Sequence, residues 1–131
     1  MEIIELLAKL VKSKSFNENV TTCTLEIESY NDFLEGRDGY DGLLIGSIVI
    51  HNTIFSLSII LNLASIPEIT PTSHGTIGLE WEKNNKVAYL EIGNTKMSFY
   101  LTQPNKEPIY IDANVEDIFL TSIKIGILIS I

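Results

Sequence analysis

Basic residues are scarce in this sequence. Nine lysines and arginines stand against 17 aspartates and glutamates, which gives a formal net charge of −8 at pH 7. Proteins that bind nucleic acid neutralise phosphates with clustered Lys and Arg, and a negative field of this size repels the same phosphates. The charge therefore argues against nucleic acid as a partner.

Cysteine is scarcer still, with Cys23 alone. A single cysteine cannot form an internal disulfide, and the chain opens without the basic, apolar and cleavage-site segments of a secretory signal. We therefore expect a cytoplasmic protein rather than a secreted, disulfide-stabilised one. His51 and His74 share no usual ligand spacing with Cys23, so we predict no metal and no other cofactor.

Familiar ligand-binding loops are missing as well. The glycines and aspartates of residues 36–42 lack the third oxygen ligand and the closing glutamate of a calcium-binding EF-hand loop. No Lys-Ser or Lys-Thr pair follows these glycines, as a phosphate-binding loop requires. Glycine and aspartate favour tight turns, and we interpret residues 36–42 as a turn.

Residues 42–67 lack charged side chains and are rich in Leu, Ile, Val and Phe, in a run long enough to span a bilayer. Its flanks, Asp41 and Glu68, are not the Lys, Arg and Trp anchors of spanning helices. We expect a long, buried core helix of a soluble domain here, and a membrane anchor over residues 43–66 is the alternative. The polar residues of the run recur at helical intervals: Ser47, His51, Ser58, Asn62 and Ser65.

The chain before this run is mixed in pattern. Residues 1–14 carry apolar side chains at helical spacing, with glutamates early and lysines late, which predicts an amphipathic helix. Residues 21–27 are β-branched enough to predict a short strand, and a helix that continues into Phe33 is the alternative. A short helix is expected to end near Glu35, because Gly36 suits the left-handed residue that closes a helix.

The chain after this run changes to the period of β-strands. Residues 66–72 contain two prolines, which lack backbone donors, and we interpret them as an extended connector. From residue 76 to residue 112, alternating apolar residues predict an antiparallel meander with turns at Asn84-Asn85 and Gly93-Asn94 and a fourth strand around Tyr110. A helix is expected to begin near Asn114, and residues 123–131 suit either a helix or a strand.

These elements predict one domain, because 131 residues are close to the commonest domain size. The expected fold class is α+β, with N-terminal helices, one of them long and buried, packed on a C-terminal antiparallel meander of three to four strands. Residues 1–66 form the mainly helical part. Residues 67–131 form the mainly antiparallel sheet, with a terminal helix or strand.

Two motifs flank the long helix. Gly36-Arg37-Asp38-Gly39-Tyr40 precedes it, and Pro67-Glu68-Ile69-Thr70-Pro71-Thr72-Ser73-His74-Gly75-Thr76-Ile77-Gly78-Leu79-Glu80-Trp81 follows it. The order resembles a family of small, uncharacterised bacterial proteins that read Gly-Trp-Asp-Gly-Tyr-Gly, a helix, and Pro-x-x-x-Pro-Thr-x-x-Gly-Gly-x-x-Leu-Glu-Trp. The likeness covers about half of the chain, with Arg37 in place of the family's Trp and Thr76 in place of its second Gly. It implies a helix packed on an antiparallel sheet and brings no catalytic activity with it.

Alternation along the strands separates a packing face of the sheet from an outer face. Tyrosine is frequent at binding hot spots because it offers a large, stiff contact area with a polar tip. Ordinary cross-strand packing, or cover from the terminal helix, is the alternative interpretation of the outer tyrosines. The packing face is predicted to hold Ile77, Leu79, Trp81, Leu90, Met97 and Phe99, and the outer face the candidate protein-binding residues Glu80, Glu82, Tyr89, Tyr100 and Tyr110.

Glu80 and Glu82 lie on one strand face at about 7 Å, a separation that paired acid and base catalysis can use. No activated nucleophile accompanies them, and a solvated strand face is favoured. The leading hypothesis is a non-enzymatic interaction protein, an antitoxin-like or immunity-like partner of a basic or toxic protein, able also to self-associate. The alternatives are a membrane-anchored protein and a small-ligand binder or enzyme. The latter would place a pocket between the long helix and the sheet, with Glu80, Glu82, His51 or Tyr40.

Overall fold

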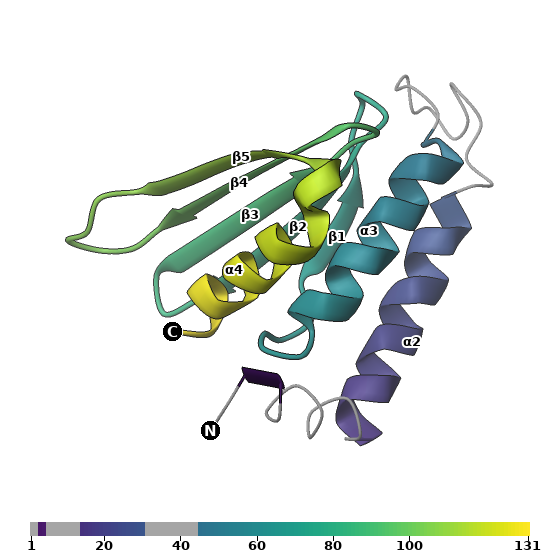
Figure 1. The fold of residues 1–131 in the computed structure, drawn as a ribbon. Coiled ribbons are helices and arrows are strands. Elements are labelled where there is room, and N and C mark those ends of the chain that lie inside the picture. The colour runs from purple at the N-terminus through teal and green to yellow at the C-terminus, as the bar shows by residue number, and fades with distance from the viewer. Residues whose placement is uncertain (1–2, 5–13, 31–44) are drawn as a thin grey trace.

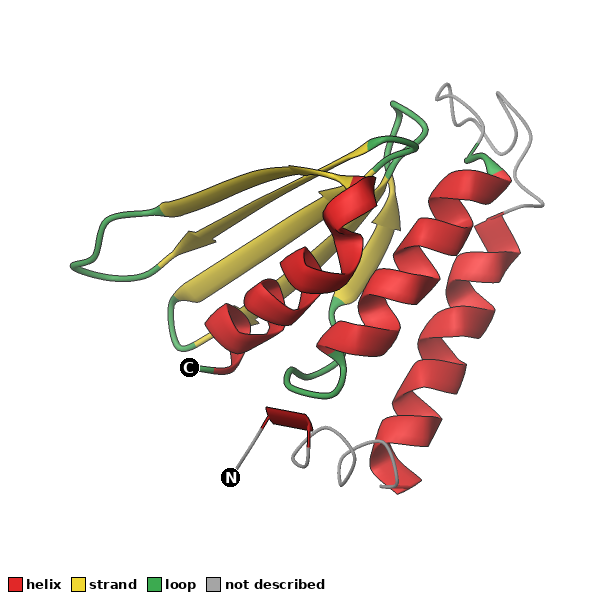
Figure 2. Ribbon diagram, viewed as in Figure 1, coloured by secondary structure: helices red, strands yellow, loops and turns green. Residues whose placement is uncertain are grey.

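The computed structural model describes residues 3–4, 14–30 and 45–131 of the chain. Helices α3 and α4 lie side by side against one face of a five-stranded sheet, and α2 lies beside α3 (Figure 1, Figure 2). This architecture confirms the predicted α+β class, with five strands rather than three to four. The elements in chain order are α2 (Lys14–Ser29), α3 (Ser47–Ile60), β1 (Glu68–Pro71), β2 (Ile77–Lys83), β3 (Lys86–Ile92), β4 (Lys96–Thr102), β5 (Ile109–Asn114), the 3-10 turn η3 (Val115–Asp117) and α4 (Ile118–Ser130).

The sheet is a meander in which each strand pairs antiparallel with the next, in the order β1-β2-β3-β4-β5. Asn84 and Asn85 join β2 to β3 with φ angles of 53° and 66°, in the left-handed region that asparagine tolerates. The Gly93 N–H donates to the carbonyl of Lys96 at 2.9 Å and closes the turn between β3 and β4. Both predicted turns and the three central strands are therefore confirmed.

The interpretation of residues 66–72 as a connector was incomplete, because Glu68–Pro71 forms the additional strand β1. It pairs with β2 in a register that sets Glu68 opposite Glu80. The proline is tolerated because β1 is at the edge of the sheet, where a missing backbone donor breaks no ladder.

The strand predicted over residues 21–27 was wrong, since these residues lie in the middle of helix α2. Cys23, Ile27 and Tyr30 are all buried, at intervals of four and three residues that place them on one face of a helix. Packing of this face against α3 outweighs the strand preference of the β-branched threonines. The helix alternative was the correct one as far as residue 29.

The long helix is shorter than predicted. Helix α3 spans 14 residues, and a hydrogen-bonded turn follows from Leu61 to Ala64. Within the described ranges, no helix combines the length and the apolar character needed to cross a bilayer. Of the polar stripe, Ser47, His51 and Ser65 are exposed, while Ser58 and Asn62 are half-buried.

The ambiguous C-terminal segment is helical, as α4 shows. Ser122 of α4 and Ser56 of α3 are fully buried, and their hydroxyl oxygens lie 2.6 Å apart in a hydrogen bond between the helices. Gly126 packs closely on α3, because a Cβ there would lie 3.6 Å from the Cα of Ile60. Lys86 of β3 donates to the carbonyls of Leu128 and Ile129 at 2.9 Å each and caps the end of α4.

The core lies between the sheet and these helices. All six residues predicted for the packing face are buried there, together with Ala88, Ile92 and Leu101 of the same face. The predictions for residues 5–13, 31–35 and 36–42 lie outside the described residues, as does Tyr40.

Candidate functional site: the outer face of the sheet

The face of the sheet opposite α3 and α4 is the candidate site. Within the described part of the chain, no helix packs on it (Figure 1, Figure 2). Side chains alternate along each strand, so the residues between the core positions point to this side. The alternative in which the terminal helix covers the outer tyrosines does not hold, because α4 packs with α3 on the other face.

Strand register brings four of the five predicted residues into one line. Glu80 on β2 is opposite Tyr89 on β3, which is opposite Tyr100 on β4, and Tyr100 is opposite Tyr110 on β5. Glu68 of β1 extends the line to the other edge. We call this set of five residues the acid–tyrosine row; Glu82 lies one row away, opposite Val87.

Sequence reasoning missed Glu68 because residues 66–72 were interpreted as a connector. The alternation of Glu68 and Thr70 with Ile69 was the available signal, and the structure shows it as a strand pattern, with the first two exposed and Ile69 half-buried. The short strand was masked in the sequence by Pro67 directly before it and by Pro71 at its end.

The three tyrosines of the row have different surroundings. Tyr89 and Tyr100 are half-buried, and their rings stack with centroids 5.6 Å apart and planes inclined by 26°. Tyr110 is 73% exposed on the edge strand β5. The packing interpretation therefore describes Tyr89 and Tyr100, whereas most of the surface of Tyr110 is exposed to solvent.

Tyr89 is fixed by a small hydrogen-bond network. Its hydroxyl donates to Oε1 of Glu91 at 3.2 Å, and the hydroxyl of Thr76 donates to Oε2 of the same carboxylate at 3.0 Å. Burial, together with the charge of Glu91 and its hydrogen bond, raises the pKa of Tyr89 to about 12. At neutral pH the Tyr89 hydroxyl is a donor, and the Glu91 carboxylate is held in one orientation.

The outer face is strongly acidic. Lys96, at one corner, is a cation on this face, while Lys86 reaches the opposite side to cap α4. Exposed carboxylates attract Arg and Lys side chains, and arginine also stacks on tyrosine rings. The carboxylate side chains that point to the outer face are those of Glu68, Glu80, Glu82, Glu91 and Asp112.

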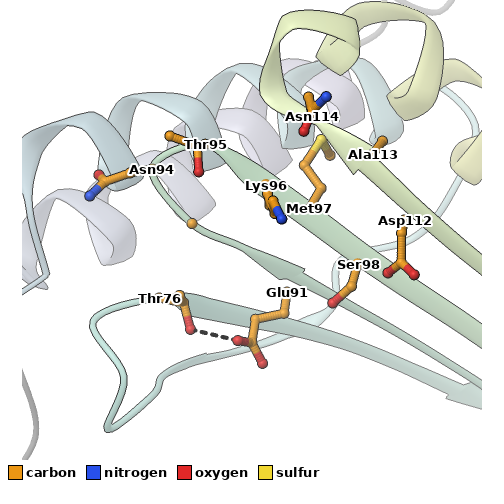
Figure 3. A pocket seen from close by; sticks show the side chains of 11 residues that line it. Thr76, Glu91, Asn94, Thr95, Lys96, Met97, Ser98, Asp112, Ala113 and Asn114 are labelled. Carbon is orange, nitrogen blue, oxygen red and sulfur yellow. Dashed lines mark hydrogen bonds between the residues drawn. The ribbon is translucent and has the colours of Figure 1, made fainter.

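An open hollow of about 630 Å³ lies at the corner of the face near the β3–β4 turn (Figure 3). Glu91, Ser98 and Asp112 follow one another across β3, β4 and β5 on its floor. Lys96 and Asn94 border the same hollow (Figure 3). The hollow continues the acidic surface beside the acid–tyrosine row.

A second hollow, of about 500 Å³, lies between the β2–β3 turn and the end of α4. No residue of α3 lines either hollow. Glu80 and Glu82 point away from α3, whereas His51 is exposed on that helix. The described residues therefore do not bring these three side chains together between the long helix and the sheet.

The groups usual in nucleophilic and metal catalysis are scattered in the described ranges. Cys23 is buried on the face of α2 that packs into the core, and burial, with a smaller contribution from Glu26, raises the pKa of its thiol to about 11. His74 is exposed in the β1–β2 turn. Among residues 3–4, 14–30 and 45–131, no three His, Cys, Asp or Glu side chains are placed to hold a metal ion.

Comparison of the chain with protein-family models, with curated proteins and with solved structures found no match. The resemblance to the family with the Gly-Trp-Asp-Gly-Tyr turn therefore stays a prediction, and the function is argued from the outer face.

Proposed function

We propose that this chain is a non-enzymatic protein–protein interaction module of the cytoplasm. In this proposal it is an antitoxin-like or immunity-like protein that binds a basic partner through the outer face of its sheet. The observation that carries the proposal is the acid–tyrosine row, which crosses all five strands on a face that no described helix covers.

The chemistry of the row suits a basic protein surface. Tyr110 supplies an exposed aromatic ring at one end, and Glu80 and Glu68 supply carboxylates at the other. Tyrosine and arginine are both enriched among residues that dominate binding energy, and opposite charges steer two proteins together. The stacked pair of Tyr89 and Tyr100 keeps the centre of the row rigid, so little side-chain entropy is lost on binding.

The test is affinity capture from the native cell with two matched variants. The outer-face variant combines Tyr110→Ala, Glu80→Gln and Glu82→Gln. The control combines Phe119→Ala, Glu116→Gln and Asp117→Asn, which removes one exposed aromatic ring and two carboxylates from the η3–α4 segment instead.

We expect the unaltered chain and the control to capture the same basic protein. The outer-face variant should bind it at least about tenfold more weakly, as loss of interface hot spots does. Equal binding by both folded variants would show that the surface is wrong. Repeated preparations of a monomeric chain with no bound protein would refute the interaction function itself.

Small-ligand binding is tested on the same preparations. A thermal-shift screen with nucleotides and metabolites would reveal a ligand that binds the native state, because such binding raises apparent stability. A reproducible shift would favour the ligand-binding alternative over the interaction module.

A further inference from the structure

The two edge strands of the sheet, β1 and β5, differ in how well their outward backbone groups are protected. On β1, the hydrogen bond from the Thr72 N–H to the Thr76 carbonyl at 2.9 Å fixes which backbone groups face β2. The alternation of an antiparallel ladder then points the Ile69 carbonyl to the free edge. The hydroxyl of Tyr30, the residue after α2, donates to the Glu26 carboxylate at 2.7 Å and lies 3.3 Å from that carbonyl, so that it covers this edge. Pro71 has no N–H to offer there. The β1 edge is thus short and guarded.

The β5 edge has neither protection. The Val115 N–H donates to the Thr95 carbonyl at 2.9 Å. Thr95 and Val115 are therefore a hydrogen-bonded pair that continues the β4–β5 ladder, in which Lys96 is opposite Asn114. Two-residue alternation then directs the N–H and C=O groups of Tyr110, Asp112 and Asn114 away from β4. The strand is six residues long and contains no proline, and no described element lies beyond it in the sheet.

An open strand edge is a template for another strand, and proteins that avoid such pairing shorten or cover their edges. The described residues cover β1 and leave β5 open, next to the exposed Tyr110 and the acidic hollow that contains Asp112. The side chains of β5 alternate between the outer face and the helix side, where Ile109 and Ile111 are half-buried. An added strand would therefore meet acidic and aromatic groups on one side and apolar groups on the other.

Charge decides which occupant fits. Two copies of β5 paired antiparallel over residues 110–114, centred on Asp112, would set Asp112 directly opposite Asp112 of the second copy, and like charges in that position destabilise a sheet. Each copy also carries a net charge of −8, so the whole molecules repel each other. A strand with a basic side chain beside Asp112 would instead be attracted both to that carboxylate and to the net negative charge of the chain.

We propose that the partner docks by adding an extended segment to the free edge of β5. This segment alternates basic side chains, one of them beside Asp112 on the outer face, with apolar side chains beside Ile109 and Ile111. The inference rests on the proposed function and names how the partner is held: backbone hydrogen bonds to Tyr110, Asp112 and Asn114 give the register, and the alternate side chains give specificity.

The experiment measures amide hydrogen exchange and nuclear magnetic resonance shifts of the full chain with synthetic peptides. The probe is a short peptide in which valine alternates with arginine. The control peptides replace arginine by glutamate, or methylate the backbone nitrogens that would face β5. Asp112→Asn is compared with Asp117→Asn, which removes the same charge from η3.

We expect the amides of Tyr110, Asp112 and Asn114 to exchange freely in the chain alone and to slow by at least about tenfold with the arginine peptide. The glutamate and methylated peptides should leave them unchanged. Asp112→Asn should weaken the effect of the arginine peptide, and Asp117→Asn should not.

Three results would overturn the inference. Equal protection by the glutamate peptide would remove the charge argument. Protection in the chain alone, with a dimer in sedimentation, would assign the edge to a second copy. Absence of protection at the three amides under every peptide would refute strand addition. In that last case the interaction function is still decided separately, by the capture experiment with the outer-face variant.

Discussion

The ring of Tyr89 lies over Gly78 of the neighbouring strand. A Cβ atom at residue 78 would overlap the tyrosine hydroxyl oxygen and lie 3.0 Å from the ring atoms Cε2 and Cζ. Tyr89 is directly opposite Glu80, so Gly78 is its diagonal neighbour, within reach of an aromatic side chain. The ring covers Gly78, which has no side chain of its own to pack on the outer side of β2.

Gly78→Ala should destabilise the protein by about 1–3 kcal/mol, because the added methyl group must displace Tyr89 from its stack and its hydrogen bond. In a Tyr89→Ala background the same change should instead stabilise by about 0.5–1 kcal/mol, since alanine suits a strand better than glycine. Urea denaturation of the four proteins in this double-mutant cycle measures both effects. Additive free energies would contradict the close packing of the two residues.

The stability of the protein should fall as the pH rises from about 10 to about 12. An unfolded tyrosine titrates near pH 10, and the folded-state pKa of Tyr89 is raised to about 12. In that interval the folded state keeps a proton that the unfolded state releases, so the free energy of unfolding decreases with pH. Below pH 10 the full contribution is present.

Tyr89→Phe should make this decline shallower without abolishing it, because burial and Glu26 also raise the pKa of Tyr30. Urea denaturation across the alkaline range, on both proteins, provides the comparison. An identical slope in the variant would show that Tyr89 does not contribute to the linkage.

Ser56→Ala should destabilise the protein by about 1–2 kcal/mol, because it leaves the fully buried Ser122 hydroxyl without its partner on α3. The double variant Ser56→Ala/Ser122→Ala should cost clearly less than the sum of the two single changes. Ser58→Ala is the control, since Ser58 bonds within its own helix, to the Phe55 carbonyl. Chemical denaturation followed by circular dichroism gives the four values, and strict additivity would refute the coupling.

Trp81→Phe should cost about 1–2 kcal/mol. The indole N–H donates to the Ser65 carbonyl at 2.7 Å and fastens the segment between α3 and β1 to the sheet. Ser65→Ala should be nearly neutral, because the bond goes to the backbone rather than to the serine side chain. Denaturation monitored by circular dichroism tests both, and equal stability of Trp81→Phe and the unaltered chain would exclude the bond as a stabilising contact.

The sequence predicted the meander and its two faces because both depend on local rules. A period of two assigns each side chain to a face, and Asn84-Asn85 can adopt the left-handed turn whatever lies elsewhere. Glu80, Tyr89, Tyr100 and Tyr110 were therefore assigned to one face from the order of residues alone. Helix α2 was missed for the opposite reason: its burial against α3 outweighs the local preference of its threonines.

The alternation of side chains along a strand does not reveal which residues of neighbouring strands lie opposite each other. Register placed Glu80 and the three tyrosines in a single row, added Glu68 to it, and separated Glu82 from it. Packing then distinguished Tyr89, folded over Gly78, from the exposed Tyr110.

The sequence by itself determined which residues alternate, which turns are possible and how acidic the surface is, because these properties reside in neighbouring residues and in composition. The tertiary structure alone decided that Tyr30, just after α2, covers the edge at Ile69 and that no described element covers the edge at Asp112. Those facts depend on which distant segments meet, and the free energy of such contacts is not encoded in any local pattern.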